Sequence, residues 1–408
     1  MKTLKTAVLA TYRSSNWLLT ACFLLLLTPT FAALSPQASV SVITVSPGRD
    51  LYDSFGHTAL WVYDPAQGID RVYGYGTYNF NAPNFYGKFV RGQLDYMISV
   101  IDMGTFLASY QYDNRSVVDQ VLNLSPAQKE EIYAFLEKNY LPENRYYKYD
   151  FFFDNCTTRI RDVVKNVAGE GIQFSPPAEK RSFRQWIDLY LQEQYWSDFG
   201  MDLGLGALSD RVATPYESMF LPETLMQGLE KATFISEGKR QRLVSQTRTL
   251  FQASPVLKEA AGFTPIRAFW LLFVIIALVT WWQYRKGKEG YQLNVFLFLL
   301  AGLIGCVLVF LWFGTDHVVT PNNWNLVWAW PLHLFIAFVL GRKSKPAWLQ
   351  TYFLVYSLAV GILLVGWKFW PQELDAELIP LVLIFGIRAL FIYVRLKSPK
   401  SVATPVVR

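Results

Sequence analysis

The sequence predicts an exported α+β domain followed by a domain of five membrane helices. Three observations predict this architecture: a basic and apolar N-terminal segment over residues 1–33, mixed strand and helix patterns over 34–265, and five long apolar runs over 266–408. The charge divides in the same way. Both ends are basic, whereas residues 34–265 carry 22 Lys and Arg against 27 Asp and Glu, a net charge of −5.

Residues 1–33 have the pattern of a signal peptide. Three basic residues precede an apolar run from Trp17 to Leu27, and a helix-breaking Pro29 and small alanines follow. Whether the segment is cleaved or retained, we expect the chain from residue 34 onward to be exported.

The exported domain begins with strands and continues with helices. Alternating apolar side chains predict three strands, at 38–46, 57–64 and 70–80. Helical spacing of apolar residues predicts helices at 125–141, directly after Asn155, and over most of 180–258. The last of these regions includes "GKRQRLVSQTRTLF", residues 238–251.

The C-terminal domain holds five apolar runs, each long enough to cross about 30 Å of hydrocarbon. We expect spans at 267–284, 292–314, 324–341, 348–367 and 377–395. Basic clusters follow the first, third and fifth spans, whereas the other two loops hold little positive charge. The positive-inside rule then predicts a multi-pass protein of the bacterial inner membrane, with the 34–265 domain in the periplasm and the C-terminus in the cytoplasm.

The same composition excludes several classes of function. An acidic exported domain argues against nucleic acid as a partner, and basic ends beside apolar runs favour the membrane. The exported domain has one His and one Cys, which cannot fill a metal shell, so no metal site and no cofactor are expected. It also lacks a G-x-S-x-G elbow and a phosphate-binding loop.

Cys156 is the residue that most needs an explanation. Cys22 lies in the signal segment and Cys306 lies within a membrane span, so neither is placed to form a disulfide with Cys156. Asp154 or Asn155 is a good N-cap, which puts Cys156 in the first turn of a helix, where the helix dipole stabilises a thiolate and backbone N–H groups face an oxyanion. The carboxylate of Asp154 opposes this effect. The alternative is a buried and inert cysteine.

His57 is the one histidine of the exported domain, and a nucleophilic cysteine needs a base. It begins a predicted strand, and Gly56 directly before it leaves room for a close partner. A lone histidine in a strand is more often structural than catalytic. By elimination, Cys156 and His57 form the one pair of nucleophile and base that this domain offers.

Six segments between about residues 40 and 230 carry a resemblance to a known family. They are, in order, "FGHTALWVYDP", "VYGYGTYNF", "FVRGQLDYMIS", "NRSVVDQVLNLS", "PENRYYKYDFFFDNCTTRIRD" and "MFLPETL". Their order is similar to that in the Lnb-type lipoprotein N-acyltransferases of Bacteroides-like bacteria. The resemblance implies a circularly permuted papain-like domain, related to the lecithin:retinol acyltransferase type, in which the histidine strand precedes the cysteine helix.

The resemblance also implies roles for individual residues. Cys156 matches the nucleophile and His57 the base. A third polar residue that orients the base is expected on the neighbouring strand, where the candidates are Tyr75, Thr77 and Asn79. The candidates for contact with substrate are Asn155, Arg159, Asp316 and His317. Two alternatives stay open: Arg159 pairs with Asp162, and the loop holding Asp316 and His317 is an ordinary interfacial loop.

The reaction that the resemblance implies is acyl transfer in two steps. An acyl chain would move from a phospholipid to Cys156 as a thioester, and then to the N-terminal amine of a diacylglyceryl-cysteine on an exported lipoprotein. Phospholipids, lipoproteins and the membrane are therefore the expected partners. One alternative is a membrane-tethered cysteine peptidase or amidase acting on cell-wall peptide, which would use the same pair. Another is a scaffold without catalytic activity.

Overall fold

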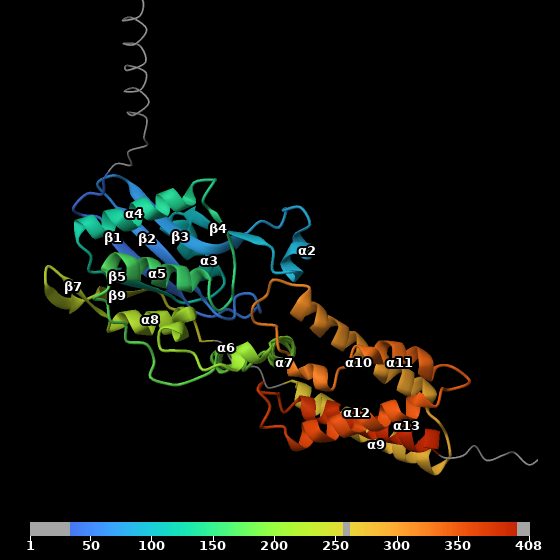
Figure 1. Cartoon of the computed structure of the whole chain (residues 1–408). Coiled ribbons are helices and arrows are strands. Elements are labelled where there is room, and N and C mark those ends of the chain that lie inside the picture. The colour runs from blue at the N-terminus through green and yellow to red at the C-terminus, as the bar shows by residue number, and fades with distance from the viewer. Residues whose placement is uncertain (1–32, 256–261, 398–408) are drawn as a thin grey trace, which may run out of the picture.

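The computed structural model describes residues 33–255 and 262–397. All but the last residue of the predicted signal peptide, including Cys22, lie outside these ranges. Figure 1 shows a domain built on a β-sheet beside a bundle of long helices. The sheet domain runs to residue 251, and the first helix of the bundle begins at Pro265.

Seven antiparallel strands form the main sheet, in the order β6-β4-β3-β2-β1-β5-β9. Their bounds are β1 Ser39–Val45, β2 His57–Asp64, β3 Ile69–Tyr78, β4 Asp95–Ile101, β5 Val117–Leu122, β6 Tyr146–Lys148 and β9 Val244–Phe251. A separate hairpin pairs β7 (Thr233–Ser236) with β8 (Lys239–Arg242). The three predicted strands are confirmed as β1, β2 and β3, which lie side by side at the centre of the sheet.

The prediction of a helix over 238–251 is wrong. These residues form β8 and β9, and β9 is the edge strand beside β5, pairing from Val117↔Phe251 to Leu122↔Val244. The many charged and polar side chains suggested an exposed helix, but an edge strand with one solvated face has the same composition. The free N–H and C=O groups of β5 form hydrogen bonds with β9. These bonds form only when two segments far apart in the chain meet, so no local sequence pattern predicts them.

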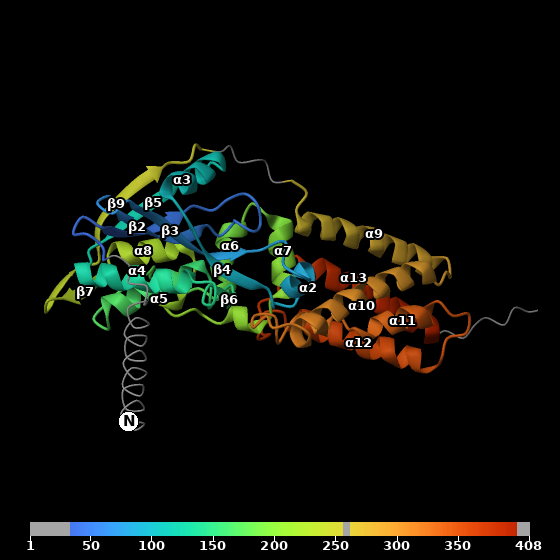
Figure 2. The ribbon, with the colours of Figure 1, turned by 90° about the horizontal axis from the view of Figure 1, so that it is seen from above.

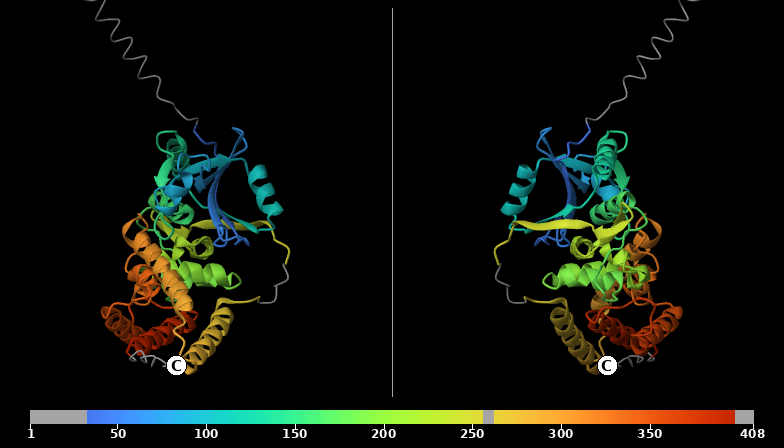
Figure 3. Two further views of the ribbon diagram at one scale, coloured as in Figure 1. Left: turned by 90° about the vertical axis from the view of Figure 1, so that its right-hand side faces the viewer. Right: turned by 90° about the vertical axis from the view of Figure 1, so that its left-hand side faces the viewer.

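Helices cover both faces of the sheet (Figures 2 and 3). On one face lie α4 (Pro126–Tyr140), α5 (Cys156–Ala168) and α8 (Pro222–Glu230), and on the other lies α3 (Met103–Tyr112). The predicted helices at 125–141 and after Asn155 are thereby confirmed. Their apolar stripes, such as Ile132 and Leu136 of α4 and Ile160 of α5, are fully buried against the strands. Burial of such side chains, worth about 1.5–3 kcal/mol each, holds the helices in place.

Smaller elements join the sheet domain to the bundle. They are α2 (Phe85–Val90), α6 (Phe183–Leu191), α7 (Tyr195–Gly204) and the 3₁₀ turns η1 (Ala207–Asp210) and η2 (Glu217–Phe220). Buried amides form the joint: Asn323 Nδ2 donates to Leu203 O at 2.8 Å, and Gln372 Nε2 donates to Leu205 O at 2.8 Å. The two parts of the chain are therefore held together by hydrogen bonds as well as by apolar packing.

In the described part of the chain, four helices are long and apolar enough to cross a membrane: α9 (Pro265–Arg285), α10 (Tyr291–Phe313), α12 (Trp348–Val365) and α13 (Leu378–Lys397). The third predicted span, 324–341, differs from expectation. It consists of a short 3₁₀ turn, η3 (Trp324–Val327), and a nine-residue helix, α11 (Leu332–Leu340). Pro331 stands between them, and its missing N–H interrupts the helical ladder.

The loops of the bundle gather at two opposite ends. Residues near 316 and 372 touch the sheet domain: Asp316 N donates to Arg91 O at 2.8 Å, and Gln185 Nε2 donates to Glu373 Oε2 at 3.2 Å. At the other end, Lys345 pairs with Glu289 at 3.1 Å. The loop connecting α9 to α10 and the loop after α11 therefore lie at the end away from the sheet domain.

Candidate active site

Cys156 is the first residue of α5, as the sequence predicted. The N-cap is Asn155, whose side-chain oxygen accepts from the N–H groups of Thr157 and Thr158 at 2.8 Å each. Thr158 returns the interaction, because its hydroxyl accepts from the N–H of Asn155 at 2.8 Å. This reciprocal cap fixes the first turn of α5 and with it the direction of the Cys156 side chain.

His57 is the first residue of β2 and pairs with Val45 across the sheet. Gly56 before it has φ +80°, and a Cβ there would lie 2.6 Å from Val45 O. Only glycine fits this turn into the strand. The next residue, Thr58, meets α5 directly, since its hydroxyl lies 3.1 Å from that of Thr157. The start of β2 and the start of α5 are thus in contact.

The contact brings the thiol of Cys156 and the imidazole of His57 together. Burial alone raises the pKa of the Cys156 thiol. The charge of His57 and hydrogen bonds from His57, from the Thr58 backbone and from the Thr157 hydroxyl outweigh burial, so the thiol pKa lies below its ordinary value. The arrangement therefore favours the thiolate form of Cys156.

Two glycines of β3 make room for this pair. A Cβ on Gly74 would lie 3.2 Å from His57 Nε2, and a Cβ on Gly76 would lie 3.9 Å from Cys156 Cβ. Gly76 has φ +96° and sits where the pairing of β3 with β4 shifts register, between Gly74 and Thr77. A glycine inside a strand often marks a close approach of other atoms. The G-x-G spacing in "GYGTY" is therefore a signal in the sequence that points to the site.

A cavity of about 200 Å³ opens beside His57. Its lining includes Thr77 and Ser99, whose hydroxyls lie 2.7 Å apart, and Ser109 and Tyr110 of α3. Ser99 was missed by the sequence analysis because β4 was not predicted. It stands opposite Gly74 in the sheet, on the side of His57.

The three candidates for the orienting residue lie in different surroundings. Thr77 lines the cavity with His57. The hydroxyl of Tyr75 donates to Asn139 Oδ1 at 2.6 Å, so its polar end is bound to α4. Asn79 accepts from the N–H of Asn81 in the turn after β3. Tyr75 also lines the cavity, but its hydroxyl is bound to Asn139, whereas the Thr77 hydroxyl bonds to that of Ser99, another residue of the cavity lining.

Arg159 pairs with Asp154, and not with Asp162 as one alternative predicted. Its guanidinium bonds both carboxylate oxygens of Asp154, at 2.6 and 2.8 Å, and its cation lies 3.6 Å from the centre of the Tyr147 ring. Asp162 instead accepts from Arg161 at 2.8 Å. The pairing neutralises Asp154, the carboxylate expected to oppose thiolate formation at Cys156.

The side chain of Asn155 has a structural role. Besides capping α5, its amide donates to Phe151 O at 2.7 Å and to Phe220 O at 2.9 Å. Its side chain therefore has no free group for substrate. Because the cap also occupies the N–H groups of Thr157 and Thr158, the N–H of Cys156 itself is the donor in this turn for which no acceptor is found in the described residues.

Asp316 and His317 contact the sheet domain at the end of α2 and on the segment that follows it. His317 Nε2 lies 3.2 Å from Val90 O, and its ring packs on Gly92, where a Cβ would lie 3.1 Å away. The charge of His317 also acts on Asp150, in the loop before α5. These contacts attach the bundle to the sheet domain, and none of them is with Cys156 or His57.

Comparison with family models gives two matches that together cover most of the chain. A model described as the Lnb N-terminal periplasmic domain matches residues 29–188, and one described as the Lnb transmembrane domain matches residues 257–399. The chain belongs to the Lnb family. Among curated proteins and among solved structures it has no match.

Membership of the Lnb family has direct consequences. This Lnb protein is a membrane protein with an N-terminal periplasmic domain and a C-terminal transmembrane domain. The family points to lipoprotein processing and to an enzyme. The predicted resemblance is confirmed at the level of the family.

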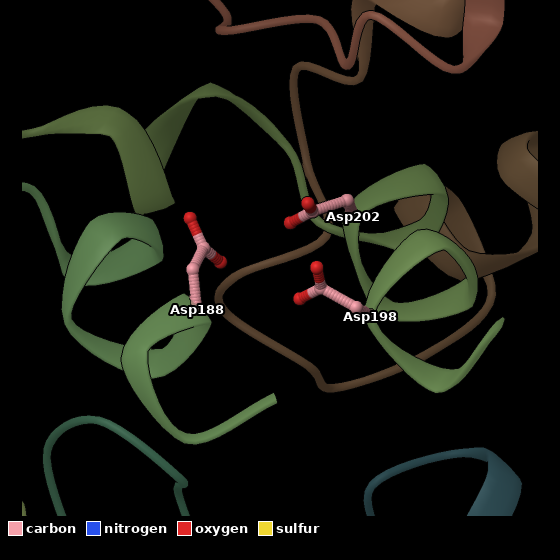
Figure 4. Close-up of side chains that lie close together, drawn as sticks. All are labelled: Asp188, Asp198 and Asp202. Atoms are coloured by element: carbon pink, nitrogen blue, oxygen red, sulfur yellow. The ribbon is translucent and has the colours of Figure 1, made fainter. Parts of the chain in front are cut away.

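A second group of polar side chains lies in the joint of this Lnb protein (Figure 4). One carboxylate oxygen each of Asp188 in α6 and of Asp198 and Asp202 in α7 lie within 4.8 Å of one another, close enough to hold a metal ion. Arg184 supplies positive charge, at 2.5 Å from Asp202 and 2.7 Å from Asp210. This cluster was not predicted, because its aspartates lie on two separate helices and the expectation of no metal site rested on His and Cys ligands alone.

Proposed function

We propose that this Lnb protein is a lipoprotein N-acyltransferase with Cys156 as nucleophile and His57 as base. It would transfer an acyl chain from a phospholipid to the amine of an N-terminal diacylglyceryl-cysteine on an exported lipoprotein. The observation that carries the proposal is the pairing of Cys156 and His57, with a thiol pKa below its ordinary value, in a periplasmic domain joined to membrane helices. No cofactor takes part.

In the first step the thiolate of Cys156 attacks the carbonyl carbon of a phospholipid ester. The oxyanion that forms would be stabilised by the N–H of Cys156 at the start of α5. When the carbon–oxygen bond of the ester breaks, the imidazolium of His57 gives its proton to the leaving oxygen. The products are an acyl thioester on Cys156 and a lysophospholipid.

In the second step the lipoprotein amine attacks the thioester carbonyl. His57, now neutral, accepts a proton from the amine, and the carbon–sulfur bond breaks to give an amide and the thiolate. Thr77 and Ser99 are the hydroxyls that we propose hold the imidazole in position, because they line the cavity on its side. Water must be excluded in this step, since it would hydrolyse the thioester.

The membrane topology that we propose has five crossings of the bacterial inner membrane. The third crossing would be made by η3 and α11 together, because the loop before them touches the sheet domain and the loop after them pairs with Glu289 at the other end of the bundle. The C-terminus would then be cytoplasmic, in agreement with the basic clusters. Holding the active site at the membrane spares the transfer of acyl chains into water, at about 0.8 kcal/mol per methylene.

We also propose that the periplasmic domain is a circularly permuted papain-like domain. The support is the order of the elements, with the histidine strand β2 before the cysteine helix α5, and an antiparallel sheet against which α5 packs.

The test is intact mass spectrometry of the full chain, incubated with phospholipid vesicles and quenched with acid. We expect a fatty-acyl adduct that neutral hydroxylamine removes, that is absent in Cys156→Ala and present in Cys306→Ser. Release of the adduct should follow addition of a diacylglyceryl-cysteine peptide, with the N-acylated peptide as product. If the wild-type thiol stays unmodified while a small soluble ester still acylates Cys156, acyl transfer from phospholipid is wrong and cell-wall peptides become the substrates to try.

A further inference from the structure

The acyl chain of the donor needs a place to lie that the cavity beside His57 does not provide. That cavity holds about 200 Å³ and is lined in part by hydroxyls. Pockets for drug-sized ligands take roughly 300–1,000 Å³ and are mostly apolar. The long chain of a phospholipid must therefore approach Cys156 from another side.

A continuous series of aromatic rings begins beside Cys156 and includes none of the residues that line the cavity. We call Tyr149, Tyr96, Tyr78, Phe85 and Phe89 the aromatic strip. A Cβ on Gly76 would meet both Tyr149, at 3.8 Å, and Cys156, at 3.9 Å, so the two side chains share one neighbour. The charge of a Cys156 thiolate also raises the pKa of Tyr149, after the larger effect of burial. The strip therefore starts at the nucleophile.

The rings of the aromatic strip follow one another without a break. Tyr149 stacks on Tyr96 with ring centres 4.5 Å apart, and Tyr96 meets Tyr78 edge to face at 5.4 Å. Tyr78 lies 5.9 Å from Phe85, the first residue of α2, and Phe85 stacks on Phe89 at 6.1 Å. Aromatic faces at these spacings present apolar surface that suits a hydrocarbon chain.

The far end of the aromatic strip is apolar and exposed. Around α2, Phe80 is 68%, Tyr86 80% and Phe89 50% exposed. Large apolar side chains gathered on a surface usually mark a contact with membrane or with a partner. The aromatic strip thus runs from the partly buried thiol of Cys156 to aromatic rings that are exposed on the surface of the described residues.

Membrane helices stand directly beside this exposed end (Figures 1 and 2). Asp316 N donates to Arg91 O at 2.8 Å, and His317 Nε2 lies 3.2 Å from Val90 O, so the end of α2 is bound to the loop that follows α10. At the end of α10, Phe313 is 74% exposed. Because α10 lies within the match to the transmembrane family model, these contacts attach α2 to the end of a membrane helix.

We propose that α2 dips into the outer surface of the membrane and that the aromatic strip holds the acyl chain of the phospholipid donor as its ester reaches Cys156. This assignment rests on the proposed acyl transfer. The contacts of Asp316 and His317 then have a function, because they hold α2 against the end of α10. The lipoprotein amine would enter from the opposite side, through the cavity beside His57.

The experiment compares Phe89→Asp and Tyr96→Ala with wild type in phospholipid vesicles, and Tyr112→Asp is the control. Tyr112 is 91% exposed at the end of α3, away from the strip. Acylation of Cys156 is followed by mass spectrometry with two donors, a long-chain phospholipid and a short soluble thioester. We expect both strip variants to lose about tenfold or more of the rate with phospholipid, since each removes apolar contact with the chain. Their rate with the short donor should equal that of the control.

A phospholipid with a photoreactive group at the end of its acyl chain provides the second readout. We expect crosslinks to the peptide that contains α2 in the full-length protein. Equal acylation rates with phospholipid in the strip variants and the control, or crosslinks confined to α9–α13, would overturn the role proposed for the aromatic strip. Neither result would contradict acyl transfer itself. A wild-type protein that reacts with the short donor and never with phospholipid would overturn the proposed function itself.

Discussion

At Cys156, burial and local charge act in opposite directions. Burial favours the neutral thiol, whereas His57, the Thr58 backbone and the Thr157 hydroxyl favour the thiolate, and the second group of effects is the larger. The positions of these groups depend on the cap of α5, the Gly56 turn and the glycines of β3. Nucleophilicity at this position is therefore a property of the surrounding backbone as much as of the cysteine.

Gly74→Ala tests the space reserved for His57. The added methyl would lie 3.2 Å from His57 Nε2 and displace the imidazole, so the pKa of the Cys156 thiol should rise toward its ordinary value. In a chain with Cys22 and Cys306 replaced by Ser, the rate of alkylation by iodoacetamide should then reach half its maximum at a higher pH. Gly200→Ala is the control, because a Cβ there meets nothing within 4 Å. An unchanged pH profile for Gly74→Ala would show that the imidazole does not act on the thiol.

Asn155→Ala tests the cap of α5. It removes the acceptor for two helix N–H groups and the donor to Phe220 O, so a loss of about 0.5–2 kcal/mol of stability is expected from the cap alone. The alkylation rate of Cys156 should fall as well, because the first turn loosens. Ser125→Ala removes the cap of α4 and serves as comparison: it should lower the melting temperature but leave alkylation unchanged. If Asn155→Ala keeps full reactivity, the cap has a structural role only.

At the scale of elements, the segment over 324–341 departs from its sequence pattern. Its apolar composition predicts a continuous span, but Pro331 interrupts the helix. The chain around Trp328 also packs tightly on α10, since a Cβ on Gly305 of α10 would lie 2.1 Å from Ala329 O. Backbone N–H groups in this irregular segment donate hydrogen bonds to oxygens of Asn323 and Asn325. Irregular backbone at membrane depth is tolerated where protein covers it in this way.

Gln372→Ala tests the joint between the two domains. The buried amide of Gln372 accepts from Trp324 N at 2.6 Å and donates to Leu205 O at 2.8 Å, and the variant leaves both groups without this partner. A loss of roughly 1–3 kcal/mol per buried group is expected, seen as a lower melting temperature and faster hydrogen exchange at Trp324. Gln185→Ala breaks an exposed bond to Glu373 and the capping bond from Ser182 N to Gln185 Oε1 at the start of α6, so it should cost less stability than Gln372→Ala. Equal effects of the two variants would contradict a role for Gln372 in the joint.

For the whole molecule, the acidic cluster links stability to pH. Burial, with the charges of neighbouring acids, raises the pKa of Asp188 to about 8 and that of Asp198 to about 7. Both lie above the value of about 3.9 in an unfolded chain, so between about pH 4 and pH 8 the folded state holds protons that the unfolded state has lost. Stability from these groups therefore falls as the pH rises through that range and is level above it.

Asp188→Asn should remove much of this dependence. We expect the variant to melt at a higher temperature than wild type at pH 8 and to differ little at pH 4. Glu217→Gln should instead lower the melting temperature at pH 8. The ion pair with Arg211 lowers the pKa of Glu217 to about 2 and so contributes stability that is present above about pH 4.5. Melting curves across this range measure both. If the stability of the wild-type protein rises steadily from pH 4 to pH 8, and that of Asp188→Asn rises in the same way, the acidic cluster does not control the pH dependence of stability.

The sequence by itself determined the features that depend on neighbours a few residues apart. Alternation predicted β1, β2 and β3, the capping pattern predicted the start of α5 at Cys156, and hydropathy predicted the membrane domain. Tertiary structure alone decided the pairings over long separations. Sheet register brings His57 and Ser99 to one side, and β9 completes the edge of the sheet. The physical reason is that periodicity and capping are local, whereas register and side-chain partners are chosen by the packing of segments that lie far apart in the chain.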